Sequence, residues 1–245
     1  FPVCVAAKIL RIPFIIYENN LFIGKTNKYL LPFAEKLFVS YKELEGISEK
    51  YQSKVCEIGN IIRKEIINIQ EKTEFIQSEE KLRILILGGS QAAKIFAEKL
   101  PEIFNKCKKA KISLKIYQQC LPEQNKFLTS FYGNLGIDFE VFNFSSNILS
   151  YFSKINLAIT RSGSSVLAEL INAKIPFISV PLPSSADDHQ LKNAIYYEKK
   201  GYSYLIEERY LDTKLFKLIK KISQDVSLLS QIMRKQREYS DKSVY

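Results

Sequence analysis

Three short segments hold the residues of this 245-residue sequence that could do chemistry: GGSQAAK (88–94), TRSGSSVLAE (160–169) and PSSADDHQLKNA (183–194). Each follows an aliphatic run and precedes a helical pattern, so each is expected to join a strand end to a helix start. Helix starts have unpaired N–H groups and a favourable dipole, and both attract anions such as phosphate. We therefore expect an anion site where these segments meet.

The first two segments are rich in small residues, and the second also carries a carboxylate. The glycines of 88–94 also fit a plain tight turn, because their spacing matches neither a dinucleotide fingerprint nor a Walker loop. If Ser165 is the N-cap of the helix that starts in 160–169, the capping-box position is Ala168, which leaves Glu169 uncommitted. Its carboxylate could accept hydrogen bonds from two vicinal hydroxyls of a ribose, or could be a solvated acid that favours the helix start.

The third segment contains His189, the only histidine of the chain. It could be a metal ligand, a general base, a binding contact or an ordinary hydrogen-bonding loop residue. Metal binding is disfavoured because adjacent residues point apart, although magnesium on Asp187 or Asp188 is kept as an alternative. Gln190 follows at the expected helix start.

Strands and helices alternate through the middle and end of the chain. Strands are expected at 82–89, 114–118, 139–144, 155–160 and 176–181, with helices around 95–104, from about 165 and near 190–200. Asp212 is the candidate N-cap of a last helix whose apolar face carries Leu215, Leu218, Ile219 and Ile222. This alternation predicts a parallel sheet, whose ligands bind at the carboxyl ends of the strands. Residues 2–60 suggest a partial βαβ region, and 65–81 a connection.

Composition narrows the class of protein. The net charge of +10 favours anionic partners, but the lysines are dispersed and could equally form a solvated surface. No nucleic-acid motif is present. The four cysteines lack zinc-site spacing and are expected to be free thiols in a reducing cytoplasm. No apolar run is long enough to cross a bilayer.

Together the segments resemble the MurG family. TRSGSSVLAELINAKIPFISVPLPSSADDHQLKNAIYYEKKG (160–201) is similar to its donor-binding region, and LGGSQAA (87–93) to its GGSQGA loop. YENNLFIGKTNKYL (17–30) resembles H-E-Q-N-x-x-x-G-x-x-N, and GNIIR (59–63) resembles GNPVR. The resemblance is collinear from Phe1 to at least Glu208.

The resemblance implies an α/β fold of GT-B type, with two Rossmann-like domains of which the first is only partly present. Residues 1–62 would belong to the acceptor-side domain and 63–245 to the donor domain, with the final helices packing back on the first domain. The implied activity is that of an inverting hexosyltransferase, which moves N-acetylglucosamine from UDP-N-acetylglucosamine to lipid I and makes lipid II for peptidoglycan. No metal or cofactor besides the donor is implied.

The resemblance also implies roles for individual residues. The backbone around Ser145 would read the uracil edge, and Glu169 would bind the ribose. Ser90 would contact the donor, and Arg63 would be the basic contact at the hinge. Asn20 matches the asparagine of the first-domain motif and would be a substrate-binding residue. His189 and Gln190 would contact the hydroxyls of N-acetylglucosamine. The turn and the helix start before Glu169 complete the set: Ser164, Ser165, Val166, Leu167 and Ala168.

Several positions depart from the family pattern. Tyr17 stands for the histidine of H-E-Q-N, Ile61 for the proline of GNPVR, and Ala92 and Lys174 for glycines. Alanine at 92 costs little if φ is negative there and is strained otherwise. The family's first Gly-rich loop, with its histidine, is expected upstream of Phe1, so no catalytic base is assigned. The alternatives are an inactive or decaying UDP-sugar-binding fragment, or another GT-B enzyme such as a lipid glycosyltransferase or UDP-sugar epimerase.

The resemblance further implies peripheral attachment to the cytoplasmic face of the bacterial inner membrane. Apolar Leu30, Leu31 and Phe33 lie near basic residues that suit an anionic surface, namely Lys25, Lys28 and Lys36. An ordinary helix core is the competing interpretation. Nucleic acid is not an expected partner.

Overall fold

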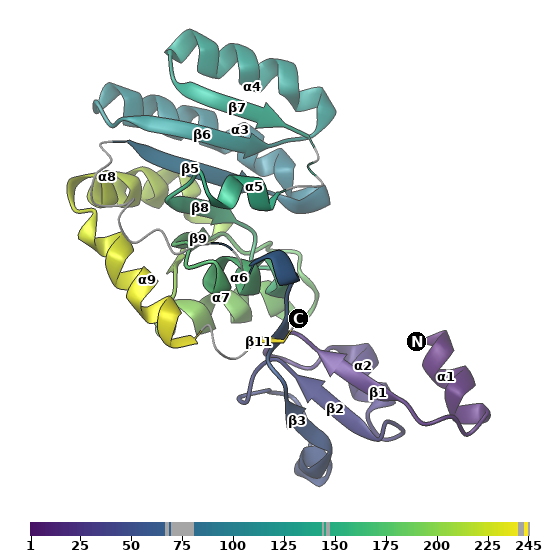
Figure 1. Ribbon diagram of the computed structural model, residues 1–245. Coiled ribbons are helices and arrows are strands. Elements are labelled where there is room, and N and C mark those ends of the chain that lie inside the picture. The colour runs from purple at the N-terminus through teal and green to yellow at the C-terminus, as the bar shows by residue number, and fades with distance from the viewer. Residues whose placement is uncertain (67–68, 70–80, 144, 146–147, 240–242, 245) are drawn as a thin grey trace.

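The computed structural model describes residues 1–66, 69, 81–143, 145, 148–239 and 243–244, with only the backbone given for 90–93 and 243–244. The chain forms two main parallel sheets flanked by helices (Figure 1). The smaller sheet has the order β1-β2-β3, and its strands span Ile15–Glu18, Lys36–Val39 and Val55–Glu57. Two helices accompany it, α1 (Pro2–Ile9) and α2 (Lys25–Leu30).

The larger sheet has six parallel strands in the order β10-β9-β8-β5-β6-β7. The strands are β5 (Leu82–Leu87), β6 (Leu114–Gln119), β7 (Asp138–Phe142), β8 (Leu157–Thr160), β9 (Phe177–Ser179) and β10 (Tyr204–Leu205). With β5 counted as strand one, this is the 3-2-1-4-5-6 order of a Rossmann sheet. The order reverses between β5 and β8, and such sheets bind their ligands outside the carboxyl ends of the strands at that point.

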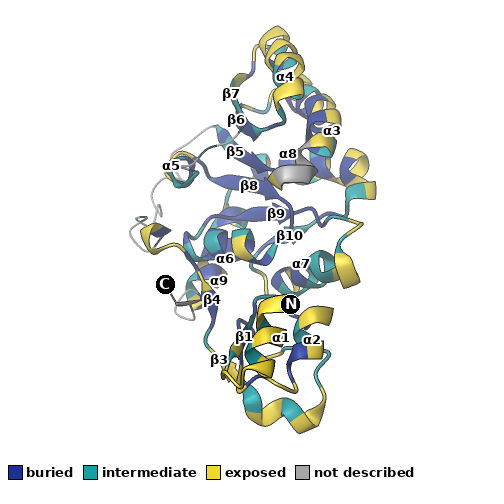
Figure 2. Ribbon diagram, turned by 90° about the vertical axis from the view of Figure 1, so that its right-hand side faces the viewer, coloured by how far each residue is buried: buried dark blue, intermediate teal, exposed yellow. Residues whose placement is uncertain are grey.

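Helices cover both faces of the larger sheet. One face packs on α3 (Gly89–Lys109), α4 (Pro122–Leu135) and α8 (Phe216–Gln224), and the other on α5 (Leu149–Phe152) and α6 (Ser164–Asn172). Alternate residues of β5 serve the two faces: Ile84 and Ile86 join the first core, and Leu85 and Leu87 the second. The buried residues in Figure 2 follow these strands, whereas α1 is largely exposed.

The last elements return toward the start of the chain. After α7 (His189–Lys199), α9 (Ser227–Tyr239) packs along α6. β11 (Ser243–Val244) then pairs with β4 (Asn60–Ile61). The C-terminal end of the described chain therefore lies beside the GNIIR segment. Within the described ranges, no helix is both long enough and apolar enough to span a bilayer.

The strands and helices predicted from hydrophobic patterns are present, but the prediction for Asp212 is wrong. A π-helical turn at Leu211–Leu215 precedes α8, and the Asp212 carboxylate pairs with Lys99 Nζ at 2.7 Å. Because the Asp212 carboxylate is paired with Lys99 of α3, Asp212 does not cap a helix. Leu215, Ile219 and Ile222 are buried as expected. Most of the predicted connection at 65–81 lies outside the described residues.

The apolar residues considered for membrane contact divide into two groups. Leu30 and Leu31 are 5% and 1% exposed and belong to the core of the smaller sheet, which agrees with the interpretation of an ordinary helix core for these two residues. They pack inward because the smaller sheet needs apolar side chains to cover Leu37 and Val39. Phe33 is 48% exposed and Tyr29 72%.

Candidate functional site

The carboxyl ends of β5 and β8 lead into two helix starts. α3 begins at Gly89 and α6 at Ser164, and no described side chain caps either start. Their first N–H groups therefore have no partner within the helix and are available to a ligand. A Cβ added at Gly89 or Gly163 would meet no heavy atom within 4 Å, so the space before both turns is open. Paired helix starts of this kind suit a diphosphate.

The N-cap of α6 is Gly163, two residues before the Ser165 considered as an N-cap from the sequence. Gly163 has the extended backbone of a cap residue, with φ −66° and ψ 135°. The hydroxyl of Ser164 donates instead to the backbone carbonyl of Asn19, and Ser165 is exposed in the first turn. Glu169 is not used in capping in either register.

The carboxylate of Glu169 is held by Arg63. Arg63 Nε donates to Oε1 at 2.7 Å, and Nη2 donates to Oε2 at 2.6 Å. Arg63 follows β4, so this bidentate pair joins the junction between the two sheets to α6. Two residues predicted to bind substrate, Arg63 as the basic contact at the hinge and Glu169 as the ribose-binding acid, are thus in contact with each other.

Gln190 ties the third loop to the second. Its Oε1 accepts hydrogen bonds from the backbone N–H of Ser162 at 3.1 Å and of Leu182 at 3.1 Å. The amide oxygen is therefore committed to the protein. Its Nε2 has no partner among the residues that the structure describes, and it remains as a donor for a ligand.

His189 lies at the start of α7, after a strained turn. Asp187 and Asp188 have φ of 51° and 53°, a left-handed conformation that aspartate tolerates better than most residues. His189 Nδ1 lies 2.6 Å from the carbonyl oxygen of Ala186. A carbonyl can only accept, so we assign the proton to Nδ1, and Nε2 of the neutral imidazole is left as an acceptor.

Arg161 fixes the strand end behind this loop. It is 6% exposed, and its Nη1 donates to the carbonyls of Val180 and Pro181, each at 3.2 Å. Its Nη2 pairs with Glu208 at 2.5 Å. A buried guanidinium needs such partners, and here they anchor the ends of β8 and β9 to the segment after β10.

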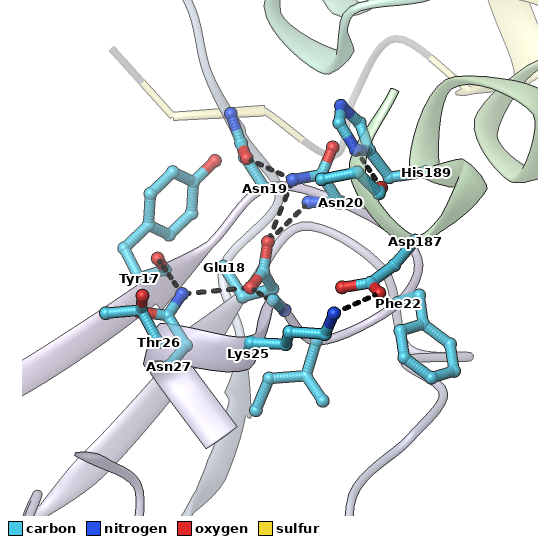
Figure 3. Close-up of a pocket in the computed structure, with 13 residues that line it drawn as sticks. Tyr17, Glu18, Asn19, Asn20, Phe22, Lys25, Thr26, Asn27, Asp187 and His189 are labelled. Carbon is cyan, nitrogen blue, oxygen red and sulfur yellow. Dashed lines mark hydrogen bonds and ion pairs between the residues drawn. The ribbon is translucent and has the colours of Figure 1, made fainter. Parts of the chain in front are cut away.

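A cavity of about 440 Å³ lies between the loop after β1 and the start of α7 (Figure 3). Glu18 is one of the lining residues, is only 3% exposed, and accepts hydrogen bonds from other residues of the cavity wall. Glu18 Oε1 accepts from the backbone N–H and the side-chain amide of Asn20, both at 3.1 Å. Its Oε2 accepts from Gly24 N at 2.9 Å and from Asn27 Nδ2 at 2.9 Å. His189 and Asp187 line the opposite wall, and Asp187 pairs with Lys25 across the cavity at 3.1 Å.

Asn193 joins the loops of the two sheets. It is 1% exposed, accepts from the backbone N–H of Leu21 at 3.3 Å, and donates to the Oδ1 of Asn20 at 3.2 Å and to the carbonyl of Ser162 at 3.3 Å. Asn20, predicted to be a substrate-binding residue, therefore has its side chain engaged with Glu18, Asn19 and Asn193.

The remaining predicted residues are spread along these elements. Leu167 and Ala168 are buried and Val166 half-buried in α6, and Ser145 is half-buried after β7. Ser90 lies in the first turn of α3, but its side chain is outside the described residues. Tyr17 has a structural role, because its hydroxyl bonds to Ser40 Oγ at 2.7 Å and accepts from Ile61 N at 3.1 Å.

Four residues of this site had no role in the sequence prediction: Glu18, Asn27, Arg161 and Asn193. All four stand at motif positions of the resemblance, so the sequence contained the signal, but no role was assigned to them from it. The alternative of a magnesium site finds no support, since the described residues contain no cluster of three or more His, Cys, Asp or Glu side chains. Asp187 pairs with Lys25 instead.

Comparison with known proteins agrees with this arrangement. Residues 83–244 match the model of the glycosyltransferase family 28 C-terminal domain. The chain is 31% identical over 240 residues to the UDP-N-acetylglucosamine--N-acetylmuramyl-(pentapeptide) pyrophosphoryl-undecaprenol N-acetylglucosamine transferase of Pelagibacter ubique (strain HTCC1062), matching 98% of this chain and 66% of that protein. The protein of the same name from Rickettsia felis (strain ATCC VR-1525 / URRWXCal2) is 32% identical over 247 residues, with 95% and 68% covered.

A solved structure extends the match to three dimensions. The crystal structure of MurG from Acinetobacter baumannii has a TM-score of 0.80 and 25% identity, covering 99% of this chain and 66% of that one. The chain thus spans about two thirds of the length of the relatives it matches. These matches do not favour another GT-B enzyme, and with the Rossmann sheet and its paired helix starts they show that the chain belongs to the MurG family of glycosyltransferases.

Proposed function

We propose that this protein binds UDP-N-acetylglucosamine and transfers its N-acetylglucosamine to lipid I, the N-acetylmuramyl-(pentapeptide) pyrophosphoryl-undecaprenol acceptor, making lipid II. The observation that carries the proposal is the pair of uncapped helix starts at Gly89 and Ser164, side by side where the strand order reverses. The names of the curated relatives supply the two substrates.

The donor would lie along the carboxyl edge of the six-stranded sheet. The backbone near Ser145 would meet the uracil, Glu169 the ribose, and Arg63 with the two helix starts the diphosphate. The sugar would extend toward His189 and Gln190 at the start of α7. The Nε2 acceptor of His189 and the Nε2 donor of Gln190 match the two hydrogen-bonding needs of a hydroxyl.

The reaction would be an inverting displacement. A hydroxyl oxygen of the acceptor attacks the anomeric carbon, the bond from that carbon to the diphosphate oxygen breaks, and the hydroxyl proton passes to a base. UDP leaves with additional negative charge. Oriented N–H groups and a guanidinium stabilise such charge, so we propose that the reaction needs no cofactor besides its donor.

The cavity beneath Asn20 and His189 would face the acceptor side. We propose that the domain boundary lies between residues 62 and 63, at the segment where β4 and β11 pair.

We also propose peripheral binding at the cytoplasmic face of the inner membrane, through the smaller sheet. Exposed Tyr29 and Phe33 with nearby lysines support that orientation toward an anionic surface.

Titration calorimetry with UDP-N-acetylglucosamine tests the donor site. The unmodified chain should bind, and Glu169→Ala should weaken binding by at least about a hundredfold, the cost of losing two hydrogen bonds to a charged acceptor. Glu35→Ala is a matched control, because Glu35 is an exposed carboxylate before β2. Undetectable binding by the unmodified chain would refute the proposed donor site.

A further inference from the structure

Arg63 and Glu169 neutralise each other in this structure. They are 106 residues apart in the sequence, yet both oxygens of the carboxylate accept from one guanidinium, at 2.7 and 2.6 Å. Within the described part of the chain, Glu169 forms no ion pair with any other cation. The acid proposed to bind the ribose and the cation proposed to bind the diphosphate are thus both occupied.

The geometry of this pair creates a competition. A bidentate guanidinium donates two parallel hydrogen bonds, one to each carboxylate oxygen, and so covers the outer edge of the carboxylate. Two hydroxyls of a vicinal diol would approach the same edge of the carboxylate to bond with both oxygens. A ribose can therefore reach Glu169 in this way only after Arg63 has moved.

Ligands differ in what they offer to the displaced guanidinium. A nucleoside brings two neutral hydroxyls to Glu169 and leaves Arg63 without an anion. A nucleoside diphosphate brings the same hydroxyls together with phosphates that the starts of α3 and α6 also attract. The side chain of Arg63 is 40% exposed and that of Glu169 15%, so Arg63 is the partner that can turn away without repacking the core.

We propose that Arg63 is a specificity-determining residue that closes the ribose site to ligands without phosphate, and that a nucleoside diphosphate opens the site by taking over its guanidinium. The proposal rests on the proposed donor site. It concerns selection among ligands, whereas that site itself is tested by UDP-N-acetylglucosamine binding.

The test compares the binding of uridine and UDP to the full chain and to Arg63→Ala. In the variant, UDP should bind about tenfold more weakly, because a charged contact to phosphate is lost. Uridine should bind about two- to fivefold more tightly, because an exposed ion pair no longer competes for Glu169. The same gain for uridine should be absent from Arg63→Ala/Glu169→Ala.

Each other outcome has a definite meaning. Uridine affinity that is unchanged in Arg63→Ala would overturn the proposal and leave Arg63 as a phosphate contact only. Weaker binding of both ligands, or a lower unfolding temperature, would point to a structural role and also overturn it. Lys64→Ala removes an exposed cation next in the chain and should change neither affinity. If the unmodified chain binds no UDP, the proposed donor site fails as well.

Discussion

His189 shows how one hydrogen bond can limit what a side chain does. Because Nδ1 is engaged with the carbonyl of Ala186, only Nε2 of the neutral ring can serve a ligand. The ring lines the cavity between the loop after β1 and the start of α7. Its neighbour Gln190 instead holds the backbone of Ser162 and Leu182, which frame the start of α6.

These contacts predict different effects for the two neighbours. His189→Ala should weaken binding of UDP-N-acetylglucosamine about fivefold, the value of one hydrogen bond, and leave UDP affinity unchanged. Gln190→Ala should weaken binding of both ligands, because it releases the loop at the proposed diphosphate site. Calorimetry with both ligands checks this, and equal loss of UDP affinity in the two variants would contradict it.

At the scale of elements, α6 ends with an unusual residue. The N–H of Lys174 bonds to the carbonyl of Ile171 at 3.1 Å, and that of Ile175 to the carbonyl of Leu170 at 3.0 Å. These are the two bonds of a Schellman motif, whose C′ residue is left-handed and usually glycine. Lys174 occupies that position with φ 55°, where the family pattern has glycine. The helix end is thus preserved at a steric cost.

Lys174→Gly should therefore increase the free energy of unfolding by about 0.5–1 kcal/mol, because the left-handed penalty exceeds the entropy cost of glycine. Denaturant unfolding measures the change. Lys174→Ala keeps the Cβ and loses the bond from Nζ to the carbonyl of Asn172, at 2.8 Å, so it should give no gain. A gain of equal size in Lys174→Ala would show that φ is not the cause.

At the scale of the whole molecule, buried tyrosines hold the two sheets and the last helix together. The hydroxyl oxygen of Tyr41, which follows β2 of the smaller sheet, lies 2.9 Å from the hydroxyl oxygen of Tyr197 in α7. Asn60 of β4 donates to the hydroxyl of Tyr239 in α9 at 3.0 Å. Both bonds cross between segments more than 150 residues apart, so the junction depends on neutral phenols.

This junction predicts a loss of stability at alkaline pH. Burial raises the pKa of Tyr41, Tyr197 and Tyr239, and burial with the Glu140 contact raises the pKa of Tyr151 to about 12. An unfolded tyrosine has a pKa of about 10. Above that pH the unfolded chain gives up protons that the folded chain retains, so the contribution is complete below about pH 10 and declines as pH rises toward the folded values.

Denaturant unfolding between pH 8 and 11.5 measures this decline. Tyr41→Phe removes one of the retained protons, so its stability should fall less steeply above pH 10 than that of the unmodified chain. Phe33→Leu, at an exposed site, should leave the slope unchanged. A flat profile above pH 10 in the unmodified chain would contradict the prediction.

Much of the fold was predictable because its signals are local. Aliphatic runs such as 82–87 indicate buried strands, and glycine or serine after them marks the turn into a helix. The end of α6 and the start of α8 were harder to predict from the sequence. Lys174 occupies a left-handed C′ position that is usually recognised in a sequence because it is glycine. The carboxylate of Asp212 pairs with Lys99 instead of capping the next helix.

By itself, the sequence determined the alternation of strands and helices, the three candidate ligand loops and the family resemblance, because these depend on neighbours a few residues apart. Only the tertiary structure decided three sets of hydrogen bonds: Arg63 with Glu169, Asn20 with Glu18 and Asn193, and Tyr41 with Tyr197. Except for the bond between Glu18 and Asn20, these contacts join residues more than 100 positions apart. The geometry of such partners is settled by the packing of whole sheets and helices, which no local pattern encodes.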